Sequence, residues 1–403
     1  MEKIYNTFYT IADETIDYLS QWYLETPVVI TTGKYKQFET VQQLLYKAIC
    51  HFVEQYEKHT DIFPLTEATV KIIKLCEAYS LPYRPGTYRP DFLIADNGNI
   101  KICEIGARFP LNGYFMSGFA SYIGETKLSC IASETKEKEY ERFLKYLFEY
   151  WGSFSKLCVL KGSDRPGDIK YYIPYFEKMN IEVTVLSPQE ISDNLDKLAN
   201  AAVVNEFNQM ELEMLSPEVL QAIAASNALN DMRSIFLIHD KRFLAILSRK
   251  SFLLQIMSNE EAELLQQYII PTYTRTQNAE IWKTAQENKD GWIIKHYLLG
   301  KSEKIYAGVF CSEDEWQQIF NSEEIEHMIL QPFIKQTKIN SKIKGQTYND
   351  YVVGTLLCFD NHFFGPGLFR ASSFEITNRV DDRKMAPWIT DNYTKTNNIF
   401  ILK

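Results

Sequence analysis

The stretch RPDFLIADNGNIKICEIG, residues 89–106, constrains the fold of this chain more than any other segment. Asn97-Gly98 stands between two runs in which apolar and polar residues alternate. An Asn-Gly pair in that setting is the strongest short-range signal for a β-hairpin, because both residues tolerate the positive φ angles of a tight turn. A two-residue loop then predicts that Asp91 lies directly opposite Glu104, on the same face of the strand pair.

Two carboxylates that face each other repel, so the predicted pairing needs an explanation. One explanation is a solvated sheet end, where water screens the repulsion. The other is a cation between them, since Mg²⁺ takes one or two protein carboxylates and keeps positions free for substrate phosphates. The same register places Leu93 opposite Ile102, and Arg89 and Gly106 on the carboxylate face. An arginine beside this pair suggests an anionic ligand, and removal of one carboxylate is expected to raise stability slightly.

The composition is that of a soluble globular protein with two or three lobes: 403 residues, of which 45% are hydrophobic and 24% are charged. The net charge of −9 argues against non-specific binding to nucleic acid or to an anionic membrane. Seven cysteines without a C-x-x-C pair predict reduced thiols in a cytoplasmic protein. No long apolar run predicts a membrane span, and the acidic, amphipathic residues 1–19 do not resemble a signal peptide.

Apolar periodicity divides the chain into four regions. Residues 1–84 predict a mostly helical N-terminal region. Residues 85–155 carry the hairpin and a following helix. Between 156 and 225, strands alternate with helices, which predicts a small Rossmann-like unit. Residues 226–403 begin with a helix and continue as strands, which predicts a largely antiparallel lobe and, for the whole chain, an α/β fold class with α+β lobes.

Several further residues have two possible roles, and one of these roles is to bind an anionic ligand. Lys295, inside the apolar strand WIIKHY, either snorkels to the surface or meets an anion in a cleft. Lys241, near a helix start, either lies in a solvated first turn or strengthens an anion site there. The loop with Gly300 and Ser302 either covers phosphates with its backbone N–H groups or is an ordinary hairpin. Arg370, at the end of an apolar strand, meets either a phosphate or an acidic neighbour.

The order of these motifs resembles the ATP-grasp superfamily, and most closely its circularly permuted branch, typified by the synthetase domain of glutathionylspermidine synthase. That branch carries an Arg-x-Asp-Phe strand and a Glu-x-Asn-Ala strand, which RPDF at 89–92 and EIGA at 104–107 match. Downstream, DK at 240–241 matches its Asn-Lys pair, and IIKHYLLGKS matches its Val-Lys-Pro strand with a glycine-rich loop. ILQPFI matches its hinge strand, and GPGLFR matches its Gly-x-x-x-Arg strand, so the resemblance covers residues 85–385.

The resemblance implies an ATP-grasp fold in which 85–155 carries the metal-binding hairpin, 156–225 is a pre-ATP-grasp unit, and 226–403 is the nucleotide-binding lobe with its lid. The functional residues that it implies are Asp91, Glu104 and Asn112 for Mg²⁺, Lys241, Lys295, Gly300, Ser302, Gln331 and Phe333 for ATP, and Arg89 and Arg370 for catalysis. Asn112 takes the place of a family Asn that is Gly106 here, and Gly has no side-chain oxygen.

The family reaction activates a carboxylate as an acyl phosphate, which an amine then attacks, with release of ADP and phosphate. Fixed positive charge and metal ions are what such a phosphoryl transfer needs. The implied cofactors are ATP and Mg²⁺, and the implied substrates are a small-molecule carboxylate and amine, such as an amino acid or a short peptide. Arg84 and Arg108 either bind a substrate carboxylate or form surface salt bridges. The alternatives are an ATP-grasp kinase that stops at a phosphorylated product and, favoured by Gly106, a nucleotide-binding pseudo-enzyme.

Overall fold

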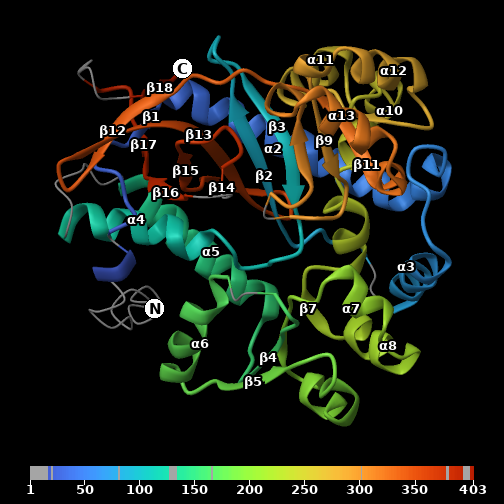
Figure 1. Cartoon of the computed structure of the whole chain (residues 1–403). Helices are drawn as coiled ribbons and strands as arrows, with labels where there is room; N and C mark the ends of the chain where they lie inside the picture. Colours follow the sequence, from blue (N-terminus) through green and yellow to red (C-terminus); the bar gives the residue numbers. More distant parts are fainter. Residues whose placement is uncertain are drawn as a thin grey trace.

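The computed structural model of the chain describes residues 17–19, 21–79, 82–126, 134–164, 167–300, 302–377, 381–393 and 400–403. These residues form four β-sheets with helices packed around them. Figure 1 shows the largest sheet in the upper half of the view and a smaller parallel sheet in the lower half. The α/β fold class with α+β lobes is therefore confirmed.

The predicted hairpin forms, in β2 (Thr87–Ile94) and β3 (Ile100–Gly106). Its loop has three residues rather than two, because the Ala95 N–H donates to the Asn99 carbonyl at 2.8 Å. Gly98 adopts a φ of 81°, in the left-handed region. A glycine in that conformation is typical of three-residue hairpin loops.

A β-bulge then corrects the register of the hairpin. Close to the turn, Leu93 is one residue away from its predicted pairing with Ile102. Cys103 is the extra residue of the bulge, and beyond it Asp91 lies opposite Glu104. The predicted carboxylate pair is confirmed, although the two-residue loop from which it was inferred is wrong. The extra loop residue shifts the strand register by one residue, and the bulged residue shifts it back.

The hairpin belongs to a seven-stranded sheet whose other strands come from the far end of the sequence. β2 pairs with the long β13 (Gln346–Phe359), and β13 pairs in turn with β15 (Phe369–Ser372). β16 (Arg383–Met385) continues the sheet beyond β15, while β12 (Ile339–Ile343) and β14 (His362–Pro366) pair with β13 at its two ends. In Figure 1 the teal hairpin lies beside these orange and red strands. This pairing of distant segments agrees with the permuted order of the motifs.

A parallel sheet forms in the region where a Rossmann-like unit was predicted. Its strands are β4 (Lys156–Leu160), β5 (Glu182–Leu186), β6 (Ala202–Asn205) and β7 (Asn227–Leu229), in the order β5-β4-β6-β7. The order reverses between β4 and β6, and in such sheets ligands bind beside the carboxyl ends of the strands at that point. The residues at which the chain divides into domains stay a prediction.

The predicted antiparallel lobe contains β9 (Trp292–His296), β10 (Ile305–Ala307) and β11 (Met328–Pro332), joined by the short β8 (Tyr273–Thr274). Its core is a separate apolar cluster that includes Trp282. This lobe carries Lys295 and the loop between β9 and β10.

A small parallel sheet joins the N-terminal region to the C-terminus of the chain. β1 (Val28–Ile30) pairs with β17 (Pro387–Ile389) on one side and with β18 (Phe400–Leu402) on the other. Among the described residues of the N-terminal region, most of 21–79 is helical, in agreement with the prediction, and β1 is a strand that the sequence patterns did not indicate; residues 1–16 lie outside the described ranges.

Helices cover the sheets and fix their relative positions. The principal α-helices are α2 (Thr32–Gln55), α3 (Glu67–Tyr79), α4 (Tyr114–Thr126), α5 (Glu134–Trp151), α6 (Ile169–Lys178), α7 (Gln209–Glu213), α8 (Pro217–Ala225), α9 (Phe243–Leu247), α10 (Lys250–Leu253), α11 (Asn259–Tyr268), α12 (Ala279–Glu287) and α13 (Glu313–Phe320). α2 packs against the large sheet, where the Phe38 and Phe92 rings lie 5.6 Å apart. No helix in the described ranges has the length and apolar character of a membrane span. Within these ranges, Cys50, Cys76, Cys103, Cys158 and Cys358 form no disulfide.

Asn230 fixes the hairpin against the end of β7. Its side-chain oxygen accepts the Thr87 N–H at 2.7 Å, and its amide group donates to the carbonyls of Thr87 and Ala107, each at 2.9 Å. Asn230 is fully buried and has a φ of 68°, a conformation that Asn adopts more readily than most residues. One side chain therefore connects the parallel sheet to both strands that carry the carboxylate pair.

We predict that Asn230→Ala lowers the free energy of unfolding by about 3–4 kcal/mol, because it leaves buried backbone groups without partners. Asn200 is the matched control, since it has a φ of 57° but is exposed. Asn200→Ala is expected to cost about 1 kcal/mol, which is the cost of the left-handed backbone alone. Urea unfolding of both variants measures the difference, and equal losses would show that the Asn230 side chain does not hold the hairpin.

Candidate functional site

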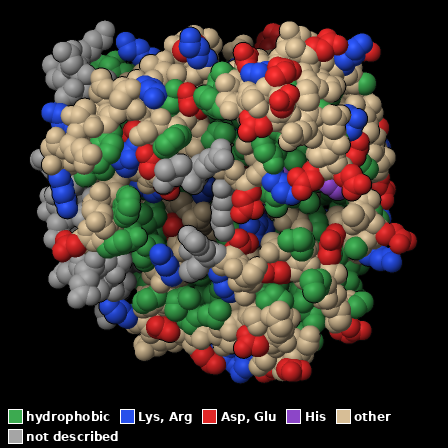
Figure 2. All heavy atoms as spheres, viewed as in Figure 1, with side chains coloured by type: hydrophobic (Ala, Val, Ile, Leu, Met, Phe, Trp, Pro, Cys, Tyr) green, Lys and Arg blue, Asp and Glu red, His purple; other side chains and the backbone are tan. Residues whose placement is uncertain are grey.

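A cavity of about 1020 Å³ opens between the large sheet, the antiparallel lobe and the parallel sheet. Figure 2 shows a hollow near the middle of this face, with acidic and basic side chains around it. The predicted site residues that line the cavity are Arg89, Asp91, Glu104, Asn112, Lys295, Gly300, Ser302, Phe333 and Arg370. The fold thus gathers predicted site residues from two distant regions of the sequence, 85–155 and 226–403, at one place.

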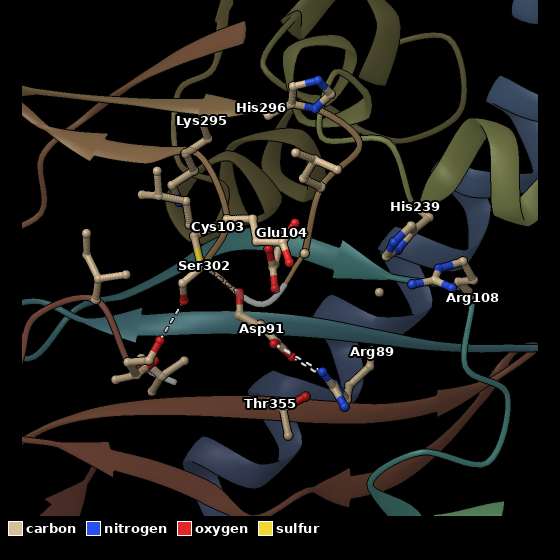
Figure 3. A pocket seen from close by; sticks show the side chains of 18 of the residues that line it. Arg89, Asp91, Cys103, Glu104, Arg108, His239, Lys295, His296, Ser302 and Thr355 are labelled. Atoms are coloured by element: carbon tan, nitrogen blue, oxygen red, sulfur yellow. Dashed lines mark hydrogen bonds and ion pairs between the residues drawn. The ribbon is translucent and has the colours of Figure 1, made fainter. Parts of the chain in front are cut away.

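Asp91 is the central charge of the site. The Arg89 side chain donates to both of its oxygens, from Nε at 3.0 Å and from Nη2 at 3.3 Å. Arg370 donates from Nη2 to Asp91 Oδ2 at 2.5 Å, from β15 across the intervening β13. The Asp91 side chain is only 2% exposed. Figure 3 shows it between Arg89 and the bulged segment of β3.

These arginines set the charge state of Asp91. Burial alone would raise the pKa of the Asp91 carboxyl, but the positive charges of Arg89 and Arg370 outweigh it and hold the pKa below its usual value. A lowered pKa means that the ion pairs stabilise the fold at neutral pH, and that this contribution is lost as the pH falls through the lowered pKa. The repulsion predicted between the two carboxylates is therefore offset by neighbouring cations.

Glu104 has a cation of its own. Lys241 Nζ lies 3.6 Å from Glu104 Oε2, and it donates to the Leu299 carbonyl at 2.6 Å. The Lys241 side chain is 3% exposed, whereas that of Glu104 is 34% exposed. Lys241 is therefore not in a solvated first turn, and its charge lies between the carboxylate pair and the loop that follows β9.

The oxygen atoms of Asp91 and Glu104 suit a hard cation. A carboxylate accepts about four hydrogen bonds, and Asp91 accepts three from the two arginines, so one acceptor position remains. Glu104 is more open. Within the described ranges, no group of three or more His, Cys, Asp or Glu side chains is arranged around a common metal position. Two carboxylates fit a magnesium ion whose other ligands are water and phosphate oxygens. Asn112 lines the same cavity, and its part in metal binding stays a prediction.

The antiparallel lobe contributes Lys295 and a loop to the opposite wall. Lys295 is 7% exposed, lines the cavity, and makes no ion pair with any residue that the structure describes. The snorkelling explanation is therefore wrong. Gly300 and Ser302 lie in the loop beside it, where the Ser302 hydroxyl donates to the Thr377 carbonyl at 2.8 Å. Figure 3 shows Lys295 and Ser302 on the side of the cavity where Cys103 lies.

The hinge strand β11 buries its predicted adenine-binding side chain. The Gln331 side chain is fully buried behind the cavity lining, and its Nε2 donates to Thr272 Oγ1 at 2.9 Å. Gln331 lies opposite Ile293, on the sheet face that also carries Lys295, and its part in adenine binding stays a prediction. Pro332 and Phe333 line the cavity instead, and the Phe333 N–H already donates to the Gly291 carbonyl at 2.8 Å.

The two arginines considered for a substrate carboxylate have different surroundings. Arg84 lies outside this cavity, where it pairs with Asp360 and stacks on the Tyr150 ring at 4.1 Å. Arg108 lines the cavity, and its Nη1 donates to Asp164 Oδ2 at 2.6 Å. The structure therefore favours a salt bridge for Arg84 and keeps Arg108 at the end of the cavity next to the parallel sheet.

The structure also places residues in the site that the sequence patterns did not indicate. His239 lies beside Arg108 in Figure 3, and its Nδ1 accepts the Ala107 N–H at 3.3 Å. Burial, with the positive charges around it, lowers the pKa of His239 to about 3, so its ring is uncharged at neutral pH. Lys384 lies opposite Arg370 on β16 and lines the cavity. Neither residue belongs to a recognisable sequence motif. Lys384 reaches the site because β16 pairs with β15, and His239 reaches it through its contact with Ala107.

Comparisons with known proteins were made over the whole chain. Residues 41–237 match the family described as the AnkG N-terminal domain. A curated protein named ATP-grasp enzyme ankG, from Aspergillus thermomutatus, is 22% identical in an alignment of 429 positions that covers 90% of this chain and 88% of that protein. A solved structure of a glutathione synthetase-like effector from Globodera pallida, in its apo form, has a TM-score of 0.59 at 10% identity. That match covers 91% of this chain and 90% of the other.

We predict that Asp91→Asn lowers stability by about 3 kcal/mol, because it leaves two poorly solvated guanidinium groups without their anion. This replaces the expectation that removal of one carboxylate raises stability. Glu104→Gln is the matched control, and it should cost less than about 1 kcal/mol because Glu104 is partly exposed and its lysine is farther away. Thermal unfolding without nucleotide compares the two, and an Asp91→Asn protein as stable as Glu104→Gln would contradict the central role of the ion pairs.

Proposed function

Because the chain is a member of the ATP-grasp superfamily, we propose that it is an ATP-dependent carboxylate–amine ligase that forms an amide or peptide bond through an acyl phosphate. The observation that carries this proposal is the convergence of opposite charges from two lobes on one cavity. The large sheet supplies Asp91 with its two arginines, and Glu104. The antiparallel lobe supplies Lys295.

The nucleotide phosphates bind between these two walls. Lys295, buried and without an anion of its own among the described residues, pairs with the phosphates, and Lys241 supports it from the carboxylate side. The backbone of the loop with Gly300 and Ser302 covers them. Asp91 and Glu104 hold Mg²⁺, which neutralises the charge of the phosphates when it is bound.

Arg89 and Arg370 act at the acyl side of the cavity, which is the side where the substrate carboxylate would be activated as an acyl phosphate. Both guanidinium groups lie within 3.3 Å of Asp91 and line the cavity, so fixed positive charge stands next to the metal-binding carboxylate. Positive charge that is already in place stabilises the transferring phosphoryl group without reorganisation of solvent. The substrate carboxylate is the acceptor of that group.

The size of the cavity favours a ligase over a kinase or a pseudo-enzyme. A cavity of about 1020 Å³ is at the upper end of the range for one small ligand, and it extends past the carboxylate pair to Arg108 and the parallel sheet. That end leaves room for a small carboxylate and an amine, such as amino acids or a short peptide. Gly106 is the feature in favour of a pseudo-enzyme, but several buried charges in one cavity are costly to keep without a ligand.

We predict that Lys295→Ala weakens ATP binding by roughly tenfold to a hundredfold, the value of one hydrogen bond to a charged group. Lys283→Ala is the matched control, because Lys283 is exposed on α12 of the same lobe and does not line the cavity. Isothermal titration with MgATP measures both affinities. Wild-type affinity in Lys295→Ala would remove this lysine from the nucleotide site.

The products are predicted to be ADP and phosphate. Acyl-phosphate chemistry transfers the terminal phosphoryl group, so the metal-binding carboxylates and arginines gather at that phosphate. A panel of the twenty common amino acids, tested singly and in pairs, is screened for ADP release, and phosphorus NMR then identifies the products. Hydroxylamine should trap the acyl phosphate as a hydroxamate when no amine is present. Pyrophosphate as the stoichiometric product would refute the acyl-phosphate mechanism.

A further inference from the structure

An amide-forming reaction needs a group that takes a proton from the amine, and this inference rests on the proposed ligase function. An aliphatic amine arrives as an ammonium ion at neutral pH and attacks only after it has lost a proton. Arginines at the acyl side cannot accept one, and the carboxylates of Asp91 and Asp164 are each paired with an arginine. A carboxylate with an oxygen that is not used in an ion pair is the chemistry that is missing.

Asp168 is a buried carboxylate at that end of the cavity. It is 5% exposed and lines the cavity from the parallel sheet, just after the loop that follows β4. Its position directly before α6 is typical of a helix N-cap, yet its side chain makes no capping bond to α6. Instead its Oδ2 accepts the backbone N–H groups of Gly113 at 2.9 Å and Met116 at 3.2 Å, at the start of α4.

Both of these hydrogen bonds go to the same oxygen atom. Asp168 Oδ1 accepts no hydrogen bond from any residue that the structure describes. The carboxylate is thus held in place through one oxygen, while the other is not used by the fold. A side chain with only a structural role at a helix start has no need to line a ligand cavity.

Asp168 is also close to the arginine at the acyl side. A side chain on Gly113 would place its Cβ 3.5 Å from Arg89 Cδ and 3.7 Å from Arg89 Nη1. Gly113 is the residue whose N–H binds Asp168, and Arg89 is the residue that binds Asp91. Short contacts therefore lead from the metal-binding carboxylate through Arg89 to Asp168.

We propose that Asp168 is a further catalytic residue, the group that accepts the proton of the amine substrate through its unused oxygen. The amine nitrogen then forms the C–N bond to the acyl carbon, and the C–O bond to phosphate breaks. The nitrogen loses two protons in all. One goes to Asp168 and later to solvent, and the other leaves with the phosphate, so the transfer balances without a further reactant.

The surroundings of Asp168 suit this role. The charged and titratable groups that face it are Arg89 from β2 and Lys170, Tyr171 and Tyr172 from α6, and α4 adds only backbone N–H groups. Burial raises the pKa of Asp168 to about 6, and the two hydrogen bonds and the positive charges offset this only in part. At pH 7 the carboxylate is ionised, yet it binds a proton more strongly than an ordinary aspartate does.

The test compares two nucleophiles in the Asp168→Asn variant. An asparagine oxygen can still accept both N–H bonds from α4, so the fold is kept, but the amide cannot take up a proton. The probes are the twenty common amino acids as carboxylates and amines, with hydroxylamine as a nucleophile that is mostly uncharged at neutral pH. We expect amide formation to fall by roughly a hundredfold or more, the usual contribution of a general base, while hydroxamate formation changes less than threefold.

Asp164→Asn is the matched control, because Asp164 is the neighbouring cavity carboxylate and is paired with Arg108. It should change amide and hydroxamate formation by the same factor. In the wild type, amide formation should fall as the pH drops below about 6, and Asp168→Asn should lose this dependence.

Each outcome decides between the two proposals. Equal losses of amide and hydroxamate in Asp168→Asn, or unchanged amide formation, would overturn the role of Asp168 and leave the ligase function in place. A wild-type protein that forms neither ADP nor hydroxamate with any probe would overturn the proposed function, and the role of Asp168 with it.

Discussion

The ion pairs of Asp91 with Arg89 and Arg370 are the interaction on which the site depends. They connect the hairpin to β15, which lies more than 250 residues later in the sequence, and they balance a buried carboxylate with fixed positive charge. Burial of these groups is costly, and only their close pairing offsets the cost. The strand order β15-β13-β2 is what brings the three side chains together. The position of the reactive end of the cavity is therefore set by sheet pairing, and not by a loop.

Because the carboxylates of the site are already in ion pairs, ligand binding would add partners to them and would not bury additional charged side chains. In the proposed function, Asp91 would hold the metal ion, and Arg89 and Arg370 beside it would stabilise the transferring phosphoryl group from the positions that they already occupy. Lys241 and Glu104 are paired in the same way on the neighbouring strand. Asp91 and Glu104 thus already have partners of opposite sign in the free protein, whereas Lys295 has none among the described residues.

The parallel sheet contributes more than a covering layer. Asn230, at the end of β7, holds both strands of the hairpin, and Asp168, after β4, holds the start of α4. These contacts run from the parallel sheet to the hairpin that carries the carboxylate pair and to the helix that follows it. They place the carboxyl ends of β4 and β6, with Arg108 and Asp164, against the acyl side of the cavity. The substrate end is therefore built at a junction of lobes, which is where ligand sites commonly lie.

The sequence by itself determined what depends on neighbouring residues: the hairpin around Asn97-Gly98, the alternation of strands and helices in the Rossmann-like unit, and the motif order that indicated an ATP-grasp fold. Tertiary structure decided the rest. The three-residue loop and the bulge at Cys103 depend on how both strands meet the rest of the sheet. Lys295 lines the cavity, whereas Gln331, on the paired strand, is bonded to Thr272 behind the lining. The sequence patterns did not indicate Asp168, because its hydrogen-bond partners are backbone groups more than 50 residues away. No local pattern encodes a contact between segments that meet only in the folded chain.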